Sequence, residues 1–257
     1  MNSQKDLWTK RYAYLVAQLR WYLRDRRRMA PDGLPFPPPN LAVLVTGSFD
    51  LDYFYENGLM GAESVRRALE RNGLDVHAFR QILDFGCGCG RIIRHWSKIE
   101  GPRFYGVDYN PRLIEWCRRF LHFAEFQTNR LTPGLPYEDG SFDFVYAYSV
   151  FTHLSETLQI LWINELKRIL QPGGILLITV HGRSRFAQLT PDEIEQFERG
   201  HLVVRREHLS GTNLCSTYHP EPYVRQELAK DFVVIDFIPG GALDGNQDIY
   251  LLQNPIG

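Results

Sequence analysis

The chain has few of the features that direct a protein across or into a membrane. Its 257 residues include only four cysteines and carry a formal net charge of −1. The first thirty residues lack the apolar core of a secretory signal, and no stretch approaches the roughly eighteen apolar residues of a membrane span. We therefore expect a cytoplasmic protein with reduced thiols. The small net charge also provides no overall field that would attract nucleic acid or an acidic substrate.

The four cysteines are too scattered to predict a structural zinc site. Cys87 and Cys89 flank one glycine, Cys117 is isolated, and Cys215 has only His219 nearby in sequence. Such a site usually has about four ligands, commonly two C-x-x-C pairs, and the sequence contains no such pair. We therefore expect no bound metal.

The most informative segment is an apolar strand that ends in three alternating glycines. It reads Ile-Leu-Asp-Phe-Gly-Cys-Gly-Cys-Gly over residues 82–90. Glycine has no Cβ and adopts positive φ angles, so Gly86, Gly88 and Gly90 allow the backbone to turn closely around a ligand. A second strand ends at Asp108, where a carboxylate can accept both hydroxyls of an adenosine ribose. The pattern predicts a nucleotide-type cofactor site.

Two positions distinguish this site from a dinucleotide site. The fingerprint G-x-G-x-x-G requires a third glycine where this chain has Arg91. Asp84, two residues before the first glycine, would repel a pyrophosphate and attract a cationic amino group. The alternative is that the Asp84 carboxylate only accepts hydrogen bonds from backbone amides of the loop. A ligand with adenosine, an ammonium group and no phosphate is S-adenosylmethionine.

Four segments in the same order and spacing resemble the class I S-adenosylmethionine-dependent methyltransferases of the small-molecule type. The likeness covers residues 81–257, and the segments are 84–90, 107–110, 141–148 and 166–178. The resemblance implies an α/β fold, a Rossmann-like doubly wound sheet of seven strands with an antiparallel last strand. It also implies S-adenosylmethionine as cofactor and methyl transfer to an O or N atom of a small-molecule acceptor.

The alternation of strands and helices predicts a largely parallel sheet. The short connection 239–246 requires the last two strands to be antiparallel. Residues 182–220 are too long for an ordinary connection and are expected to form a substrate lid within the 81–257 domain. The expected strands are 81–86, 103–108, 124–128, 142–148, 174–181, 232–238 and 247–253, and the expected helices are 90–99, 111–123, 155–170 and 222–230.

Two further parts are expected before this domain. The pattern of residues 1–40 predicts an amphipathic helix followed by a stiff proline-rich linker from residue 31. Residues 41–80 are expected to form a cap with a helix at 62–72. The first helix should pack on the domain or on a second copy of the chain, as a homodimer. Its apolar face comprises Trp8, Tyr12, Leu15, Leu19 and Tyr22 or Leu23.

The N-terminal segment is strongly basic. Residues 1–28 contain eight Lys or Arg and two Asp, a net charge of +6, which leaves −7 for the remainder. The cluster from Arg24 to Arg28 is interpreted as a solvated helix end, favourably placed at the negative pole of the helix dipole. The alternative is a methyltransferase that holds RNA, a protein or an anionic surface through this cluster.

Cofactor positions follow from the resemblance, residue by residue. Tyr109 and Leu131 should flank the adenine. Asn129 stands where the family more often has an acid, and its oxygen can still accept from the adenine amine. Tyr148 should lie near the methionine part, unless it is only an aromatic packed at the sheet edge. The full set is Asp84, Gly86, Cys87, Gly88, Asp108, Tyr109, Asn129, Arg130, Leu131 and Tyr148.

Three histidines are candidates for chemistry. Ligands of a parallel sheet bind at the carboxyl ends of the strands, which favours His181 after the fifth strand and His153 after the fourth. Either could be a base if the acceptor is a hydroxyl, and His219 is a third candidate if the lid folds inward. The alternative for each is a hydrogen-bonded structural histidine.

The acceptor itself is not determined by the sequence. Residues 148–151 read Tyr-Ser-Val-Phe, unlike the Asn-Pro-Pro-Tyr segment with which relatives that methylate nucleic-acid bases hold a flipped base. This disfavours nucleic acid as the substrate. A non-catalytic module that binds the cofactor, and other adenosine-type enzymes such as aminopropyl transferases, remain alternatives.

Overall fold

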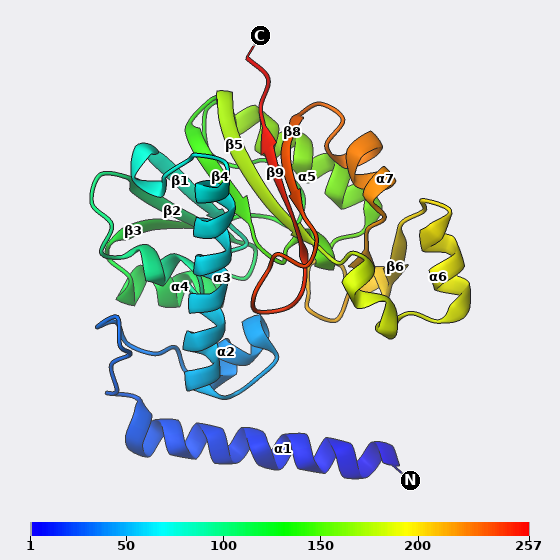
Figure 1. Cartoon of the computed structure of the whole chain (residues 1–257). Helices are drawn as coiled ribbons and strands as arrows, with labels where there is room; N and C mark the ends of the chain where they lie inside the picture. The colour runs from blue at the N-terminus through cyan, green and yellow to red at the C-terminus, as the bar shows by residue number, and fades with distance from the viewer. Residues whose placement is uncertain (1, 257) are drawn as a thin grey trace.

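A central seven-stranded sheet organises the chain (Figure 1). The computed structural model describes residues 2–256, without the side chains of residues 2–8 and 10. The strand order is β3-β2-β1-β4-β5-β9-β8. The strands are β1 Gln81–Phe85, β2 Arg103–Asp108, β3 Ala124–Thr128, β4 Phe142–Ala147, β5 Leu170–Val180, β8 Val233–Ile238 and β9 Asp248–Gln253.

Strand direction confirms the predicted fold class. The first five strands in chain order pair in parallel, whereas β9 is antiparallel to both of its neighbours, β5 and β8. From β1 the chain adds β2 and β3 on one side and then returns to add β4 on the other side. A crevice forms where the order reverses in such a sheet, at the carboxyl ends of β1 and β4, and ligands bind there.

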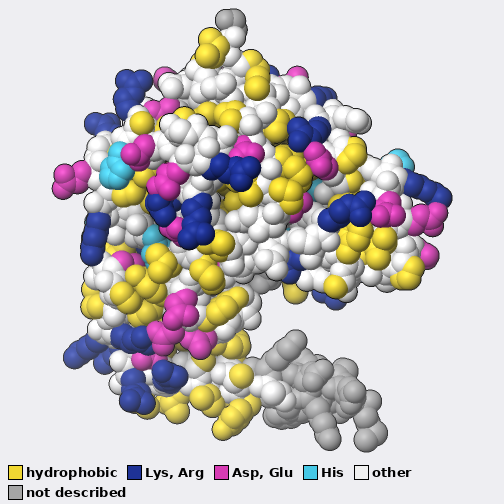
Figure 2. Space-filling view, viewed as in Figure 1, with side chains coloured by type: hydrophobic (Ala, Val, Ile, Leu, Met, Phe, Trp, Pro, Cys, Tyr) yellow, Lys and Arg dark blue, Asp and Glu magenta, His cyan; other side chains and the backbone are white. Residues whose placement is uncertain are grey.

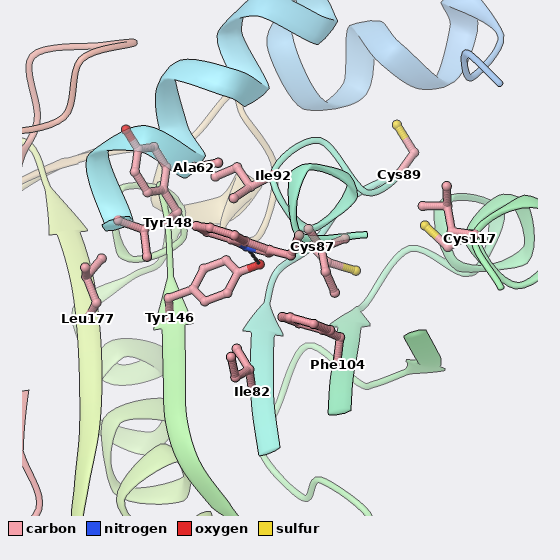
Figure 3. Packing of buried hydrophobic residues seen from close by; sticks show 14 of the residues in the cluster. Ala62, Ile82, Cys87, Cys89, Ile92, Phe104, Cys117, Tyr146, Tyr148 and Leu177 are labelled. Atoms are coloured by element: carbon pink, nitrogen blue, oxygen red, sulfur yellow. Dashed lines mark hydrogen bonds between the residues drawn. The ribbon is translucent and has the colours of Figure 1, made fainter. Parts of the chain in front are cut away.

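Alternating side chains bury the two faces of the sheet against separate layers. Ile82, Phe104 and Tyr146 belong to one core cluster, with residues of the cap and of α4 (Figure 3). Leu83 and Val145 belong to a second cluster, with residues of α5. The covering helices are α3 Leu51–Arg71, α4 Pro111–Phe120, α5 Glu156–Ile169, and α7 Glu221–Tyr223, which continues as a π-helical segment at Val224–Leu228.

The expected helix at 90–99 is wrong. Only Ile93–Trp96 forms a short 3-10 turn in this segment. Most of its side chains are buried, and the fully buried Arg94 is held by Asp32 at 2.6 Å. The segment is therefore shaped by contacts with distant residues, which override its local helix propensity.

The expected cap helix at 62–72 is too short, because α3 begins at Leu51. Two glycines inside α3 hide this start, since glycine weakens a helix by about 1 kcal/mol relative to alanine. Both glycines are needed for close packing. A Cβ at Gly58 would lie 2.1 Å from the Arg91 carbonyl oxygen, and one at Gly61 would lie 2.9 Å from Ile92 Cδ1.

The first helix, α1 Asn2–Arg20, lies along one end of the molecule and continues as a π-helical segment at Trp21–Asp25 (Figure 1). Its inward contacts include Tyr14, whose ring packs on Phe49 at 5.6 Å, and Trp21, which packs on the core. The expected apolar face points away from the domain. Its described members are between 59% and 71% exposed: Tyr12, Leu15, Leu19, Tyr22 and Leu23. The side chain of Trp8 lies outside the described residues.

The proline-rich segment after α1 is docked on the sheet domain. Asp32 pairs with Arg94, and Phe36 is buried in the core. The segment ends where Pro39 opens α2 Pro39–Thr46. The two cap helices therefore begin from an anchored chain.

Residues 182–220 form a separate layer beside the C-terminal end of β5 (Figure 1). Helix α6 Pro191–Glu198 is followed by a small antiparallel sheet of β6 Val203–Arg205 and β7 Ser216–Tyr218. Basic and acidic side chains are interspersed on the face drawn in Figure 2. Among the described residues, no helix is long and apolar enough to cross a membrane.

Candidate cofactor-binding site

A cavity of about 210 Å³ opens where the strand order reverses. Its wall combines the glycine turn after β1, the ends of β2 and β4, part of α2, and lid residues 211–213. All ten cofactor positions expected from the sequence line this one cavity: Asp84, Gly86, Cys87, Gly88, Asp108, Tyr109, Asn129, Arg130, Leu131 and Tyr148. Within residues 2–256, no three His, Cys, Asp or Glu side chains are grouped to hold a metal.

The glycine turn is confined on both sides. Gly86 and Gly88 have φ angles of 79° and 58°, in the left-handed region. A Cβ at Gly86 would lie 2.4 Å from Val150 Cγ2, and one at Gly88 would lie 2.7 Å from Val45 Cγ2 of α2. The amides of Gly86 and Cys87 also donate to the Val107 carbonyl at 2.8 and 3.0 Å. Glycine is therefore required here by both conformation and space.

Asp108 is held by the backbone at the end of β2. Its Oδ2 accepts from the Gly88 amide at 3.0 Å, and its Oδ1 accepts from the Asn110 amide at 2.8 Å. Burial raises the pKa of Asp108 to about 6, although both amide bonds act in the opposite direction. Each carboxylate oxygen keeps a further lone pair, so two ribose hydroxyls can be accepted at the cavity.

Asp84 carries a buried oxygen, Oδ2, that has no hydrogen-bond partner. Burial raises the pKa of Asp84 to about 7, while the Tyr146 hydroxyl and the Arg91 guanidinium lower it. An unsatisfied buried carboxylate oxygen is costly, and an ammonium group in the cavity would satisfy it. The Ile93 amide also favours the charged form, so Asp84 holds the local backbone as well.

The part of the cavity wall that was expected to hold an adenine contains Asn129, Tyr109 and Leu131. Asn129 Nδ2 donates to the Arg130 carbonyl at 2.6 Å, and its buried Oδ1 has no partner. This free acceptor suits an exocyclic amine. A Cβ at Gly211 would lie 2.5 Å from Leu131 Cδ1 and 3.8 Å from Tyr109 Cε1. Gly211, in the segment 182–220, therefore packs closely on Leu131 and lies near Tyr109, the two side chains expected to flank the ring.

Sequence reasoning missed a polar cluster at the end near Tyr148. The Tyr148 hydroxyl donates to Asp244 Oδ1, and Arg91 Nη1 donates to Asp244 Oδ2 at 2.8 Å. Arg91 lines the cavity, whereas Asp244 belongs to the connection between β8 and β9. In the sequence, Arg91 stood out only because it occupies the position of the missing third glycine. No motif pointed to Asp244.

Ser149, which also lines the cavity, was missed as well. Its φ of 59° is in the left-handed region, which is uncommon for a residue other than glycine. The Ser149 amide donates to Thr179 Oγ1 at 2.7 Å, and Gln247 Nε2 donates to Ser149 Oγ at 2.8 Å. These bonds hold the strained backbone beside the ligand site.

The three candidate histidines occupy different positions. His153 lines the cavity, and its Nδ1 lies 2.7 Å from the Cys215 carbonyl. A carbonyl only accepts, so Nδ1 carries the proton and Nε2 of the neutral ring is free to act as a base. Burial lowers the pKa of His153, which favours that neutral form.

His181 and His219 do not line the cavity. The His181 ring is 6.4 Å from the ring of His153, and its Nδ1 lies 3.2 Å from the Thr217 carbonyl. His219 Nε2 lies 3.0 Å from Gln159 Oε1. Burial lowers the pKa of both imidazoles to about 3.

Comparison with known proteins relates the central part of the chain to methyltransferases. The sequence model described as "Methyltransferase domain" matches residues 83–178, which include the turn, β2 and β4. The chain thus contains a stretch that matches a methyltransferase domain, and its structure has the fold of the S-adenosylmethionine-dependent methyltransferases. The orphaned oxygens of Asp84 and Asn129 fit the ammonium and adenine groups of this family's cofactor, S-adenosylmethionine.

Named relatives are similar over part of their length. Methyltransferase GfsG of Streptomyces halstedii is 30% identical over 125 residues, covering 46% of this chain and 44% of the relative. Norajmaline N-methyltransferase of Rauvolfia serpentina is 23% identical over 164 residues, covering 62% of this chain and 55% of the relative. The chain thus spans about half the length of these relatives.

A solved structure shares the fold. A SAM-dependent methyltransferase from Methanosarcina mazei superposes with a TM-score of 0.52 at 21% identity, covering 69% of this chain and 93% of that chain.

The raised pKa of Asp84 predicts pH-dependent cofactor binding. Only the ionised carboxylate attracts an ammonium group, and Asp84 remains protonated below its pKa of about 7. Affinity for S-adenosylmethionine should therefore rise about tenfold between pH 6 and pH 8, because the ionised fraction rises by that factor. The free energy of unfolding without ligand should change oppositely and fall as pH rises from about 4 to about 7.

Calorimetry on the wild type and Asp84→Asn measures both effects. The variant should retain only the weaker dependence that Asp108, with a pKa of about 6, contributes. Equal affinity for the wild type at pH 6 and pH 8 would contradict the assignment of Asp84.

Proposed function

We propose that this protein transfers the methyl group of S-adenosylmethionine to an oxygen or nitrogen atom of a small-molecule acceptor. One observation carries the proposal: ten positions matched to the family's cofactor contacts line a single cavity, and two of them present buried oxygens without partners. The norajmaline N-methyltransferase supports a small-molecule acceptor, because its name specifies one. The cofactor supplies the methyl group on a sulfonium.

The residues of this chain mainly bind and orient. Asp84 holds the ammonium group, Asp108 accepts from the ribose hydroxyls, and Asn129 accepts from the adenine amine. Methyl transfer is an in-line displacement in which the charge of the sulfonium disperses, so alignment and exclusion of water carry most of the rate. The crowded turn and the surrounding segments support both tasks.

The parts outside the core sheet are proposed as covers of this site. Val45 of the 41–80 cap packs on Gly88, and Gly211 of the 182–220 lid packs on Leu131. Residues 1–40 are proposed as a separate N-terminal extension. We also propose a cytoplasmic location, supported by four cysteines that are all unpaired.

Cofactor binding tests the function first. The wild type should bind S-adenosylmethionine and S-adenosylhomocysteine in the micromolar range, about −8 kcal/mol, and NAD much more weakly. Asp108→Ala should weaken both ligands by roughly 2 to 3 kcal/mol, because two hydroxyls lose a charged acceptor. Calorimetry measures this, and Asp139→Ala, at a side chain that is 82% exposed, is the control. Tighter binding of NAD would contradict the proposal.

Transfer of a labelled methyl group then tests the acceptor class. Label should enter a pool of small metabolites rather than RNA or protein. Transfer to RNA or protein would favour the alternative in which the basic N-terminal segment holds a macromolecule. Binding without any transfer would favour a non-catalytic module.

We further propose His153 as the base for a hydroxyl acceptor, with His181 beside it as the second candidate. Its Nε2 is free, and the residue lines the cavity. His153→Gln should lower turnover by about 10² to 10⁴ with cofactor affinity unchanged. Since burial lowers the pKa of His153, the wild-type rate should rise with pH through a limb below 6.5, and the variant should lose that limb.

His181→Asn is the matched comparison and should lower turnover less than tenfold. A larger loss in His181→Asn than in His153→Gln would make His181 the base. Small losses in both variants would indicate an acceptor that needs no base, such as a neutral amine.

We also propose that α1 mediates a homodimer. Two observations support this: its outward apolar face is more than half exposed, and the net charge of +6 in residues 1–28 complements the −7 of the remainder, so the helix of one copy suits the body of another.

Light scattering should give twice the mass of one chain for the wild type. The double variant Leu15→Glu/Leu19→Glu should give a monomer, whereas Leu161→Glu, at an exposed leucine of α5, should remain dimeric. A monomeric wild type would contradict the proposal.

A further inference from the structure

Asp244 bridges two side chains of the cavity wall that come from different elements. It accepts from Arg91, which follows the glycine turn, and from Tyr148, which follows β4. The side chains of Arg91 and Asp244 are each 9% exposed, so the ion pair is almost fully buried. A buried pair of this kind interacts more strongly than one at the surface.

The surrounding bonds fix this cluster in place. Arg91 Nη1 also donates to Asn57 Oδ1 of α3 at 2.5 Å, and the Leu243 amide donates to Ser64 Oγ at 2.9 Å. Tyr148 lies against α3, where a Cβ at Gly61 would be 3.6 Å from its Cζ (Figure 3). The cap helix, the turn, β4 and the β8–β9 connection therefore meet at Asp244.

Arg91 is the only cation that this cluster contains, and Asp244 is its only carboxylate partner within residues 2–256. The charge of Arg91 acts on titratable groups that line the cavity. Burial raises the pKa of Asp84, and the Tyr146 hydroxyl and then the Arg91 charge lower it. Burial lowers the pKa of His153, and the Arg91 charge lowers it further. An uncompensated Arg91 would disfavour a second cation in the same cavity.

We propose that Asp244 is a positioning residue that neutralises Arg91 and so removes a repulsion that the sulfonium cofactor would experience in the cavity and that its neutral thioether product would not. This inference rests on the proposed function. S-adenosylmethionine carries one more positive charge than S-adenosylhomocysteine, because transfer of the methyl group converts the sulfonium to a thioether. Loss of the Asp244 charge therefore penalises the first ligand more than the second.

The test is Asp244→Asn in the full chain. Asparagine keeps an oxygen that can accept from Tyr148 but removes the negative charge. Calorimetry at low ionic strength gives the dissociation constants of both ligands. The ratio of the constant for S-adenosylmethionine to that for S-adenosylhomocysteine should rise about tenfold, equivalent to about 1.4 kcal/mol. A structural role alone would weaken both ligands equally and leave the ratio unchanged.

Asp32→Asn is the matched control. It breaks the chain's other deeply buried Arg–Asp pair, with Arg94, at 2.6 Å and with side chains 8% and 0% exposed. Neither residue lines the cavity. This variant should lose stability without changing the ratio of dissociation constants.

Arg91→Gln keeps the test decisive if Asp244→Asn does not fold, because it leaves the Asp244 carboxylate without its cation and should lower the same ratio, and an unchanged ratio would overturn the inference. A double variant then shows whether the two charges act through each other. Arg91→Gln/Asp244→Asn removes both charges, so its ratio should return to within about twofold of the wild type. An unchanged ratio in Asp244→Asn, or a tenfold rise that persists in the double variant, would overturn the inference while leaving the proposed function intact. Failure of the wild type to bind either ligand would instead overturn the proposed function, and this inference with it.

Discussion

The crowding of the turn after β1 is the constraint on which the site depends. Gly86 and Gly88 adopt left-handed conformations between Val150 on one side and Val45 on the other, and the turn is pinned to β2 through Val107. No side chain fits at these two positions, so the turn presents only backbone atoms to the cavity at Gly86 and Gly88. The cap, the segment after β4 and the end of β2 are all placed by their contact with this turn.

Two carboxylates beside the turn are buried at a cost in folding free energy. Burial raises the pKa of Asp84 to about 7 and that of Asp108 to about 6. Two backbone amides donate hydrogen bonds to the Asp108 carboxylate and offset part of its burial cost, whereas Asp84 Oδ2 accepts no hydrogen bond. Such a cost is typical of a ligand site that is organised before the ligand binds, because the ligand supplies the missing partner. The cavity is therefore shaped for a cationic adenosine ligand rather than for a phosphate.

Local patterns in the sequence predicted the strands, the glycine turn and Asp108, because each depends on neighbouring residues. The helix at 90–99 was wrong, and the start of α3 was hidden by Gly58 and Gly61, because in both cases packing against distant segments decides the conformation. Asp244 could not be found at all. It meets Arg91 across 153 positions of the chain, and no periodicity or motif records such a contact.

The residues at the cavity come both from inside and from outside the range that matches the family model. Residues 83–178 contain all ten expected cofactor positions. Val45, Gly211 and Asp244 lie outside that range, yet each packs directly on a cavity residue. The matched range therefore contains all the expected cofactor positions, while residues 41–80, residues 182–220 and the β8–β9 connection contact the cavity residues from outside that range.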